Sequence, residues 1–148
     1  MYKRISSTRR AYLAGFLDGD GSIYVRAKPN STYRYGFQVA PYIVLFQSQK
    51  DRKGFEEVCS HIGIGHLRER KDGILEYIIS RKDAILEFLQ IVKPYVILKR
   101  AQAALLEQIL KQKEEVESEQ DFKKLIQLID SFRTLNYSKK RKVRIPTP

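Results

Sequence analysis

A short acidic stretch near the start of the chain has the clearest chemical potential. Asp18, Gly19, Asp20 and Gly21 follow residues 11–17, whose small and apolar side chains are typical of a helix. Asp-Gly pairs are common in surface turns, so a plain turn is one interpretation. Carboxylates gathered at the end of a helix are also suitable ligands for divalent metal ions, which promote hydrolysis by activating water.

The helix before this turn has one unusual face. In helical geometry that face carries only small residues and one carboxylate: Ala11, Ala14, Gly15 and Asp18. Such a face buries little area in a core, but it lets two backbones approach closely. We therefore expect it to contact a second helix, so that carboxylates from both helices meet at a site for divalent ions.

The spacing of Asp18, Asp20 and Ser22 also fits the opening of an EF-hand calcium loop. That loop requires glycine at its sixth position and a bidentate glutamate at its twelfth. Here these positions are Ile23 and Pro29, so an EF-hand is excluded.

The charge of the chain indicates a polyanionic partner. Its 148 residues include 28 Lys and Arg against 17 Asp and Glu, a formal net charge of +11. Nucleic acid is the leading candidate. A membrane surface would require a basic amphipathic helix or a lipidation motif, and the sequence shows no convincing case of either. No apolar run is long enough to span a bilayer or act as a signal peptide, so we expect a soluble intracellular protein, in an organelle or in an archaeal or bacterial cytoplasm.

The single cysteine, Cys59, excludes a disulfide within the chain. It lies between Val58 and Ile62 on an apolar helical face, which predicts a buried structural thiol.

Hydrophobic periodicity predicts the order αββαββα, followed by further helices. Ser6, Ser7 or Thr8 is expected to cap the first helix, and Pro41 indicates a bulge or an edge in the second strand. The length suits one domain over residues 1–148, with a core over about 8–100, helices over about 98–135 and a basic tail over 136–148. The first helix is expected to end near residue 18, and further helices are expected over 52–62, 82–92, 98–115 and 121–135. The expected strands cover 21–28, 33–49, 66–70 and 74–80.

Four antiparallel strands with helices on one face leave the other face free. We predict that this face is almost purely basic, whereas solvated faces usually mix signs. Arg, Lys and Gln contact base edges and phosphates, and a β-ribbon fits the major groove. The residues expected to bind DNA on this face and on its first loop are Tyr24, Arg26, Lys28, Asn30, Thr32, Tyr33, Arg34, Gln38, Tyr42, His66, Arg68, Arg70 and Glu76.

Residues 12–21, with the sequence YLAGFLDGDG, resemble the LAGLIDADG motif of homing endonucleases. From Ala11 to the basic tail, the chain is similar to the small homodimeric, intron-encoded branch of that family. The resemblance implies an α+β fold of the αββαββα LAGLIDADG type. It also implies a site-specific endonuclease that makes a staggered double-strand break in a long pseudo-palindromic target. Because the chain holds one motif copy, we expect a homodimer whose two-fold axis matches that of the DNA.

The resemblance assigns the chemistry to the acidic turn. Asp20 is the expected metal ligand, with the carbonyl of Gly19 as a further ligand. Mg²⁺ is the expected ion, Ca²⁺ is expected to support binding without cleavage, and Mn²⁺ is expected to substitute for Mg²⁺. Cys59 is expected to be buried and the only histidines are His61 and His66. A metal mechanism therefore fits better than a covalent nucleophile.

Other family positions surround this site by resemblance. Gln49 matches the glutamine, Arg52 or Lys53 the arginine, and Lys99 the lysine, whereas Asp18 is assigned a supporting or helix-capping role. The alternative interpretation is that Gln49, Arg52 and Lys99 are ordinary surface residues without a role in catalysis. A C-terminal segment is expected to contact phosphates, with a disordered tail or an import signal as the alternative; its residues are Asn136, Ser138, Lys139, Lys140, Arg141 and Lys142.

Two other functions are possible on this scaffold. The protein would be an intron RNA maturase or a catalytically inactive DNA-binding regulator. Both acidic motif positions are present, which disfavours the regulator, and long RNA-binding extensions are absent, which disfavours the maturase. The expected partners are double-stranded DNA and a second copy of the chain, with no membrane and no small-molecule substrate.

Overall fold

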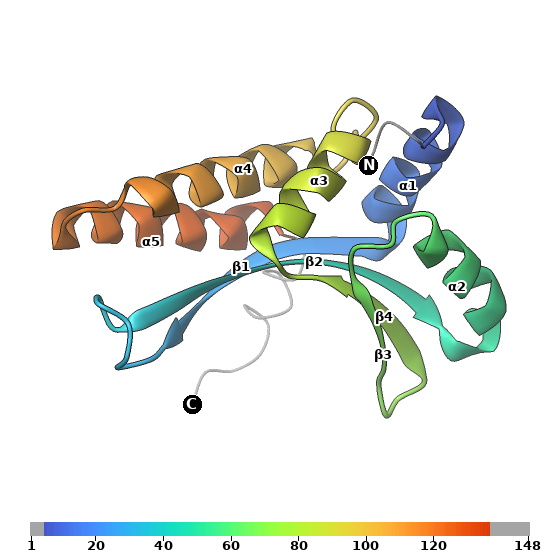
Figure 1. The fold of residues 1–148 in the computed structure, drawn as a ribbon, viewed down its shortest axis with the longest axis horizontal. Helices are drawn as coiled ribbons and strands as arrows, with labels where there is room; N and C mark the ends of the chain where they lie inside the picture. Colours follow the sequence, from blue (N-terminus) through green and yellow to red (C-terminus); the bar gives the residue numbers. More distant parts are fainter. Residues whose placement is uncertain (1–4, 137–148) are drawn as a thin grey trace.

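A curved antiparallel sheet carries helices on one face and leaves the other face open (Figure 1). The computed structural model describes residues 5–136, and the order of elements confirms the αββαββα prediction. The elements are α1 (Ser7–Asp20), β1 (Gly21–Pro29), β2 (Phe37–Ser48), the 3₁₀ turn η2 (Gln49–Asp51), α2 (Arg52–Ser60), β3 (His66–Glu69), β4 (Ile74–Ile79), α3 (Lys82–Val92), α4 (Arg100–Glu115) and α5 (Glu119–Leu135).

The strands are ordered β1-β2-β4-β3, and each neighbouring pair is antiparallel. Strand β2 pairs with β1 over residues 37–45 but with β4 only over 43–48, so β1 and β2 form an arm that extends beyond β4. Pro41 lies opposite Val25 on this arm, where β2 has no neighbour on its other side. The edge position predicted for Pro41 is confirmed, and the ladder passes it without a bulge.

Helix α1 runs two residues further than predicted and joins β1 directly. Ser6 is its N-cap, since the Ser6 side chain accepts a hydrogen bond from the N–H of Arg9 at 3.2 Å. At the other end, a Cβ on Gly21 would lie 2.7 Å from both Cδ1 and the carbonyl oxygen of Leu17. Only glycine therefore permits this abrupt change from helix to strand. As a result, Gly19 and Asp20 belong to the last turn of α1.

Strand β2 begins at Phe37, not at Tyr33 as predicted. Residues 30–36 form a loop closed by the hydrogen bond from the N–H of Asn30 to the carbonyl of Gly36, at 2.8 Å. Gly36 has a φ of +83°, a conformation that favours glycine and ends the strand geometry there. The remaining predicted boundaries differ from the observed ones by a few residues, and helix α3 begins and ends where predicted.

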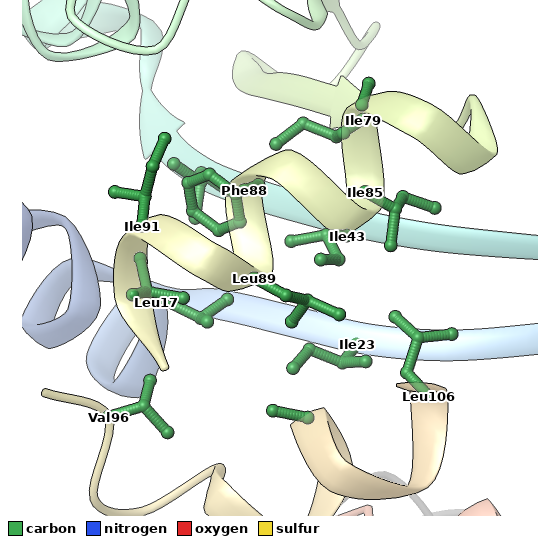
Figure 2. Packing of buried hydrophobic residues seen from close by; sticks show 14 of the residues in the cluster. Leu17, Ile23, Ile43, Ile79, Ile85, Phe88, Leu89, Ile91, Val96 and Leu106 are labelled. Atoms are coloured by element: carbon green, nitrogen blue, oxygen red, sulfur yellow. The ribbon is translucent and has the colours of Figure 1, made fainter. Parts of the chain in front are cut away.

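Buried apolar side chains fix α1 against the sheet and against helix α3. Leu17 from α1, Ile23 and Ile43 from the sheet, Phe88 from α3 and Leu106 from α4 are all fully buried and belong to one cluster (Figure 2). Burying each such side chain contributes about 1.5–3 kcal/mol. The acidic end of α1 is therefore held in a defined position relative to the strands. Within residues 5–136, no helix combines the length and the apolar character needed to cross a bilayer.

Cys59 is buried, as predicted, and burial raises the pKa of its thiol to about 12. Because an exposed thiol titrates near 8.5, the unfolded chain loses this proton first as pH rises. Stability is therefore expected to fall between about pH 9 and 12. Urea unfolding at pH 8 and pH 10.5 would measure this decrease in the free energy of unfolding. The tyrosines Tyr24 and Tyr77 contribute in the same direction, since burial raises their pKa as well. Cys59→Ala should accordingly lose less stability than the wild type, and an equal loss would contradict the prediction.

Candidate active site and DNA-binding face

The two aspartates at the end of α1 have different surroundings. The carboxylate of Asp18 accepts hydrogen bonds from the backbone N–H groups of Ile97, Leu98 and Lys99, at 2.8, 3.1 and 3.0 Å. It therefore binds the segment that leads into α4, which fits the supporting role that was one of the two predicted for it. The side chain of Asp20, by contrast, is exposed and makes no hydrogen bond or ion pair within the described residues. Asp20 is thus the carboxylate that is available to an ion.

Lys99 lies beside this acidic turn because Asp18 fixes its backbone. Its ammonium Nζ donates a hydrogen bond to the carbonyl oxygen of Asp18 at 3.0 Å. The structure therefore brings Lys99 to the end of α1, as the family resemblance implied. A half-buried cation at this position lowers the cost of gathering negative charge around Asp20.

The register of β1 and β2 brings a second glutamine, Gln47, close to the end of α1, whereas the predicted Gln49 lies beyond β2. Gly21 pairs with Leu45, so Gln47, two residues further along β2 on the same face, extends past the start of β1 toward the end of α1. Gln49 lies in η2, where its N–H donates to the carbonyl of Gly73 in the β3–β4 turn at 2.8 Å. Gln47 shares its parity with Ile43 and Leu45, and its side-chain oxygen accepts a hydrogen bond from the N–H of Ser48 at 2.8 Å.

Arg52 begins α2 and is bound to two carboxylates of its own protomer. Its guanidinium contacts Glu56 at 3.1 Å and Glu69, at the end of β3, at 2.6 Å. These hydrogen bonds, with that to Glu69 the larger cause, raise the pKa of Arg52. The pair with Glu69 ties α2 to β3. The neighbouring Lys53 is exposed, so both cations lie near the beginning of α2.

On the open sheet face, strands β1 and β2 carry a cluster of tyrosines and cations. The rings of Tyr24 and Tyr42, which face each other across the strands, stack with centroids 5.1 Å apart. The guanidinium carbon of Arg26 lies 5.4 Å from the Tyr24 centroid, and Lys28 Nζ donates to the Tyr42 hydroxyl at 2.8 Å. Neither cation pairs with a carboxylate within the described residues. The rings thus hold both cations in place on an open surface.

Strands β3 and β4 differ, because a carboxylate lies among their cations. Glu76 is only 15% exposed and lies 3.4 Å from Arg68 and 3.9 Å from Arg70, and Arg70 also contacts Asp72 at 2.5 Å. The prediction of an almost purely basic face is therefore wrong for this half. His66 lies exposed at the start of β3. Free positive charge is concentrated on the β1–β2 arm.

The loop at the end of this arm presents exposed side chains. Thr32, Tyr33 and Arg34 are exposed, and Gln38 follows half-buried on β2. Asn30 has a structural role, because its side-chain oxygen accepts from the N–H and hydroxyl of Thr32 at 3.0 and 2.6 Å. The loop therefore has a defined shape.

Comparison with known proteins identifies the family. The model for LAGLIDADG endonuclease matches residues 13–109. This chain belongs to the LAGLIDADG endonuclease family. It is 34% identical to DNA endonuclease I-CreI of Chlamydomonas reinhardtii over 137 residues, which cover 92% of this chain and 83% of the relative. It is 31% identical to DNA endonuclease I-CvuI of Chlorella vulgaris over 133 residues, covering 90% and 83%.

A solved structure of homing endonuclease I-CvuI, in complex with its target in the presence of calcium, has the same fold. It superposes with a TM-score of 0.82 at 29% identity, covering 88% of this chain and 83% of that chain. A second I-CvuI complex, with uncleaved DNA and magnesium, gives a TM-score of 0.81. The fold predicted from the LAGLIDADG resemblance is confirmed.

The exposed face of the LAGLIDADG helix differs from the one predicted. Ala14 is fully buried in its own protomer, so its assignment to a dimer contact is wrong. Asp18 is half-buried and binds backbone groups of its own protomer, and its dimer contact stays a prediction. Gly15 and Gly19 lie four residues apart on the exposed side with Ala11, and a Cβ at either glycine would meet nothing within 4 Å. Glycine in a helix costs about 0.5–1 kcal/mol relative to alanine. No close contact within the described protomer requires glycine at position 15 or 19.

The C-terminal prediction is only partly covered by the described residues. Asn136 is the last residue that the structure describes, and its side-chain amide donates a hydrogen bond to the carbonyl of Ile23 in β1 at 3.1 Å. The other predicted contacts of this segment lie outside the described residues: Ser138, Lys139, Lys140, Arg141 and Lys142.

Proposed function

We propose that this protein is a site-specific homing endonuclease. In this proposal a homodimer makes a staggered double-strand break in a long pseudo-palindromic DNA by metal-dependent hydrolysis. The observation that carries the proposal is the carboxylate of Asp20, which has no partner among residues 5–136, at the end of a glycine-lined helix next to an open sheet face. The relatives named DNA endonucleases, and the I-CvuI structures that contain DNA, support it. Because its proposed substrate is genomic DNA, we infer an intracellular site of action.

Asp20 from each protomer would hold the metal at the two-fold axis, together with the carbonyl of Gly19. Carboxylate and carbonyl oxygens suit Mg²⁺, which we propose as the working ion. When bound, the metal lowers the pKa of water and stabilises the attacking and leaving oxygens. Within residues 5–136, no three His, Cys, Asp or Glu side chains of one protomer form a metal cluster. Oxygens from two protomers and from DNA would therefore complete the coordination.

Other residues would prepare the phosphate for attack. The ammonium of Lys99, fixed beside Asp18, would offset charge that develops on the phosphate. Gln47, at the end of β2, would orient water by hydrogen bonding. Arg52 or Lys53 at the start of α2 would contact the backbone near the cut. The open sheet face would lie in the major groove; on it, Arg26 and Lys28 have no carboxylate partner in the described part of the chain.

A cleavage assay tests this function. Plasmids that carry the I-CreI or I-CvuI target, or a randomised library of long inverted repeats, would be incubated with protein and Mg²⁺, Mn²⁺ or Ca²⁺. We expect double-strand cleavage at one sequence class with Mg²⁺ or Mn²⁺, and binding alone with Ca²⁺. Sequence-specific binding without cleavage in any of these ions would favour the regulator. Binding of structured RNA in preference to DNA would favour the maturase.

The choice between two glutamines gives a separate prediction. Gln47→Ala is expected to lower the single-turnover cleavage rate about 10- to 100-fold, because the strand register places Gln47 just beyond the start of β1, on the side of the acidic turn. Gln49→Ala is the matched control and should change the rate less than about threefold, since Gln49 lies beside Gly73. Equal effects of the two substitutions, or a larger effect at Gln49, would contradict the assignment from register.

A further inference from the structure

The loop between β1 and β2 is attached to helix α5 by aromatic rings. Phe122, in the first turn of α5, stacks on Tyr35 with centroids 5.1 Å apart and an interplanar angle of 22°. Phe37 lies against the same ring of Phe122 at 6.2 Å, also at 22°. The guanidinium carbon of Arg34 lies 5.3 Å from the Tyr35 centroid, so the ring group also supports an exposed cation. A single side chain on α5 thus contacts the loop on both sides of Gly36.

The loop has internal hydrogen bonds, but these do not connect it to the rest of the protein. The N–H of Asn30 donates to the Gly36 carbonyl at 2.8 Å, that of Tyr33 to Asn30 at 3.1 Å, and that of Gly36 to Tyr33 at 3.0 Å. Turns with exposed hydrogen bonds at the end of a strand pair open readily. A tertiary contact such as the Phe122 stack is what lowers the frequency of opening.

Helix α5 is attached to the β1–β2 arm and its loop at both of its ends. At its start Phe122 contacts the loop, and just after its end the amide of Asn136 donates to the carbonyl of Ile23 at 3.1 Å. The 17 residues of α5 span about 25 Å, close to the roughly 30 Å of the nine residues of β1. Figure 1 shows α4 and α5 lying along the β1–β2 arm. The helix therefore supports the arm over most of its length.

We propose that Phe122 is a positioning residue that holds the β1–β2 loop in a DNA-reading conformation. Through this loop it sets base preference at the outer ends of the target. The DNA part of this inference rests on the proposed function. Asp20 lies at one end of β1 and the loop at the other, about 30 Å away. At 3.4 Å per base pair, the loop reaches at most about nine base pairs from the centre of the site. A loop held in one shape loses less conformational freedom on binding, so its contacts discriminate bases more strongly.

Amide hydrogen exchange without DNA tests the positioning itself. Phe122→Ala is expected to speed exchange at Asn30, Tyr33 and Gly36 by about tenfold or more, and to leave β4 amides unchanged. Phe122→Tyr keeps the ring and should restore slow exchange. Tyr35→Phe is the matched control, because the buried Tyr35 hydroxyl has no hydrogen-bond partner within the described residues. Unchanged exchange in Phe122→Ala would overturn the inference, as would faster exchange throughout the sheet.

Base preference tests the consequence for recognition. Cleavage of targets substituted at each position in turn would be compared for the wild type, Phe122→Ala and Phe122→Tyr. We expect Phe122→Ala to lose preference only at the outer positions of both half-sites, with kcat at saturating DNA unchanged and with Phe122→Tyr like the wild type. A uniform loss over all positions, or an unaltered profile, would overturn the DNA-reading part. A wild type without any sequence preference would instead overturn the proposed function.

Discussion

Replacing Asp20 by asparagine is expected to abolish cleavage and to leave DNA binding intact. The substitution removes the negative charge that would hold the metal, and it changes no contact within the described protomer because this carboxylate has none. We expect single-turnover cleavage to fall by about 10³-fold or more, a size typical for loss of a metal or of a charge-stabilising group. Gel-shift titration in Ca²⁺ should give a dissociation constant within about threefold of the wild type.

Asp18→Asn is the matched control for this prediction, since it makes the same chemical change two residues away. Asp18 accepts three backbone hydrogen bonds, so its loss of charge should destabilise the fold by about 1–3 kcal/mol. The effect would be seen in thermal unfolding, where Asp20→Asn should match the wild type. If Asp20→Asn still cut at the wild-type rate, or if both variants unfolded equally early, the division of roles between these aspartates would be wrong.

The elements with strong periodicity could be predicted from the sequence. Helix α3 begins at Lys82 and ends at Val92 as predicted, because six buried apolar residues follow a helical spacing and Pro94 comes shortly afterwards. The acidic turn was also identified correctly as a feature of the end of a helix. Both results depend on local patterns, and local patterns are what a sequence displays directly.

Residues that depend on tertiary contacts were harder to place. Ala14 shares a helical face with Ala11, but its burial depends on which elements pack around α1. Gln49 was predicted from the family resemblance and Gln47 was not considered, because the point where β2 ends and α2 begins is set by pairing with β1 and by the η2 turn. No hydrophobic pattern specifies that register to one residue.

The start of β2 shows how a correct pattern leads to a wrong boundary. Tyr35 and Phe37 alternate with polar neighbours, as residues of a half-buried strand do. Their rings stack against Phe122, which is about 85 residues further along the chain, so Tyr35 packs on α5 without joining the sheet. Likewise, parity placed Glu76 on the open face, but it did not indicate that Glu76 would neutralise Arg68 and Arg70.

Replacing Gly15 by leucine is expected to separate the dimer without unfolding the protomer. A Cβ at Gly15 meets no atom within 4 Å and Gly15 is exposed, so we expect the isolated protomer to accept the larger side chain. It should even stabilise the helix, by up to about 1 kcal/mol, because leucine is the better helix former. Between two closely packed helices, however, an isobutyl group on each would force the backbones apart and move both Asp20 carboxylates from the axis. We expect a monomer in sedimentation equilibrium and a loss of double-strand cleavage of about 100-fold or more.

A leucine on another exposed helix face separates this effect from general hydrophobicity. Ala104 is exposed on a different helix, α4, so Ala104→Leu adds apolar bulk outside the glycine face of α1. This control should stay dimeric and active. If Gly15→Leu were dimeric and cut normally, the glycines of α1 would need another explanation. If Gly15→Leu were monomeric with full thermal stability, contact with the partner helix would explain why α1 carries two glycines. In this proposal, only that close contact benefits from the absence of a side chain.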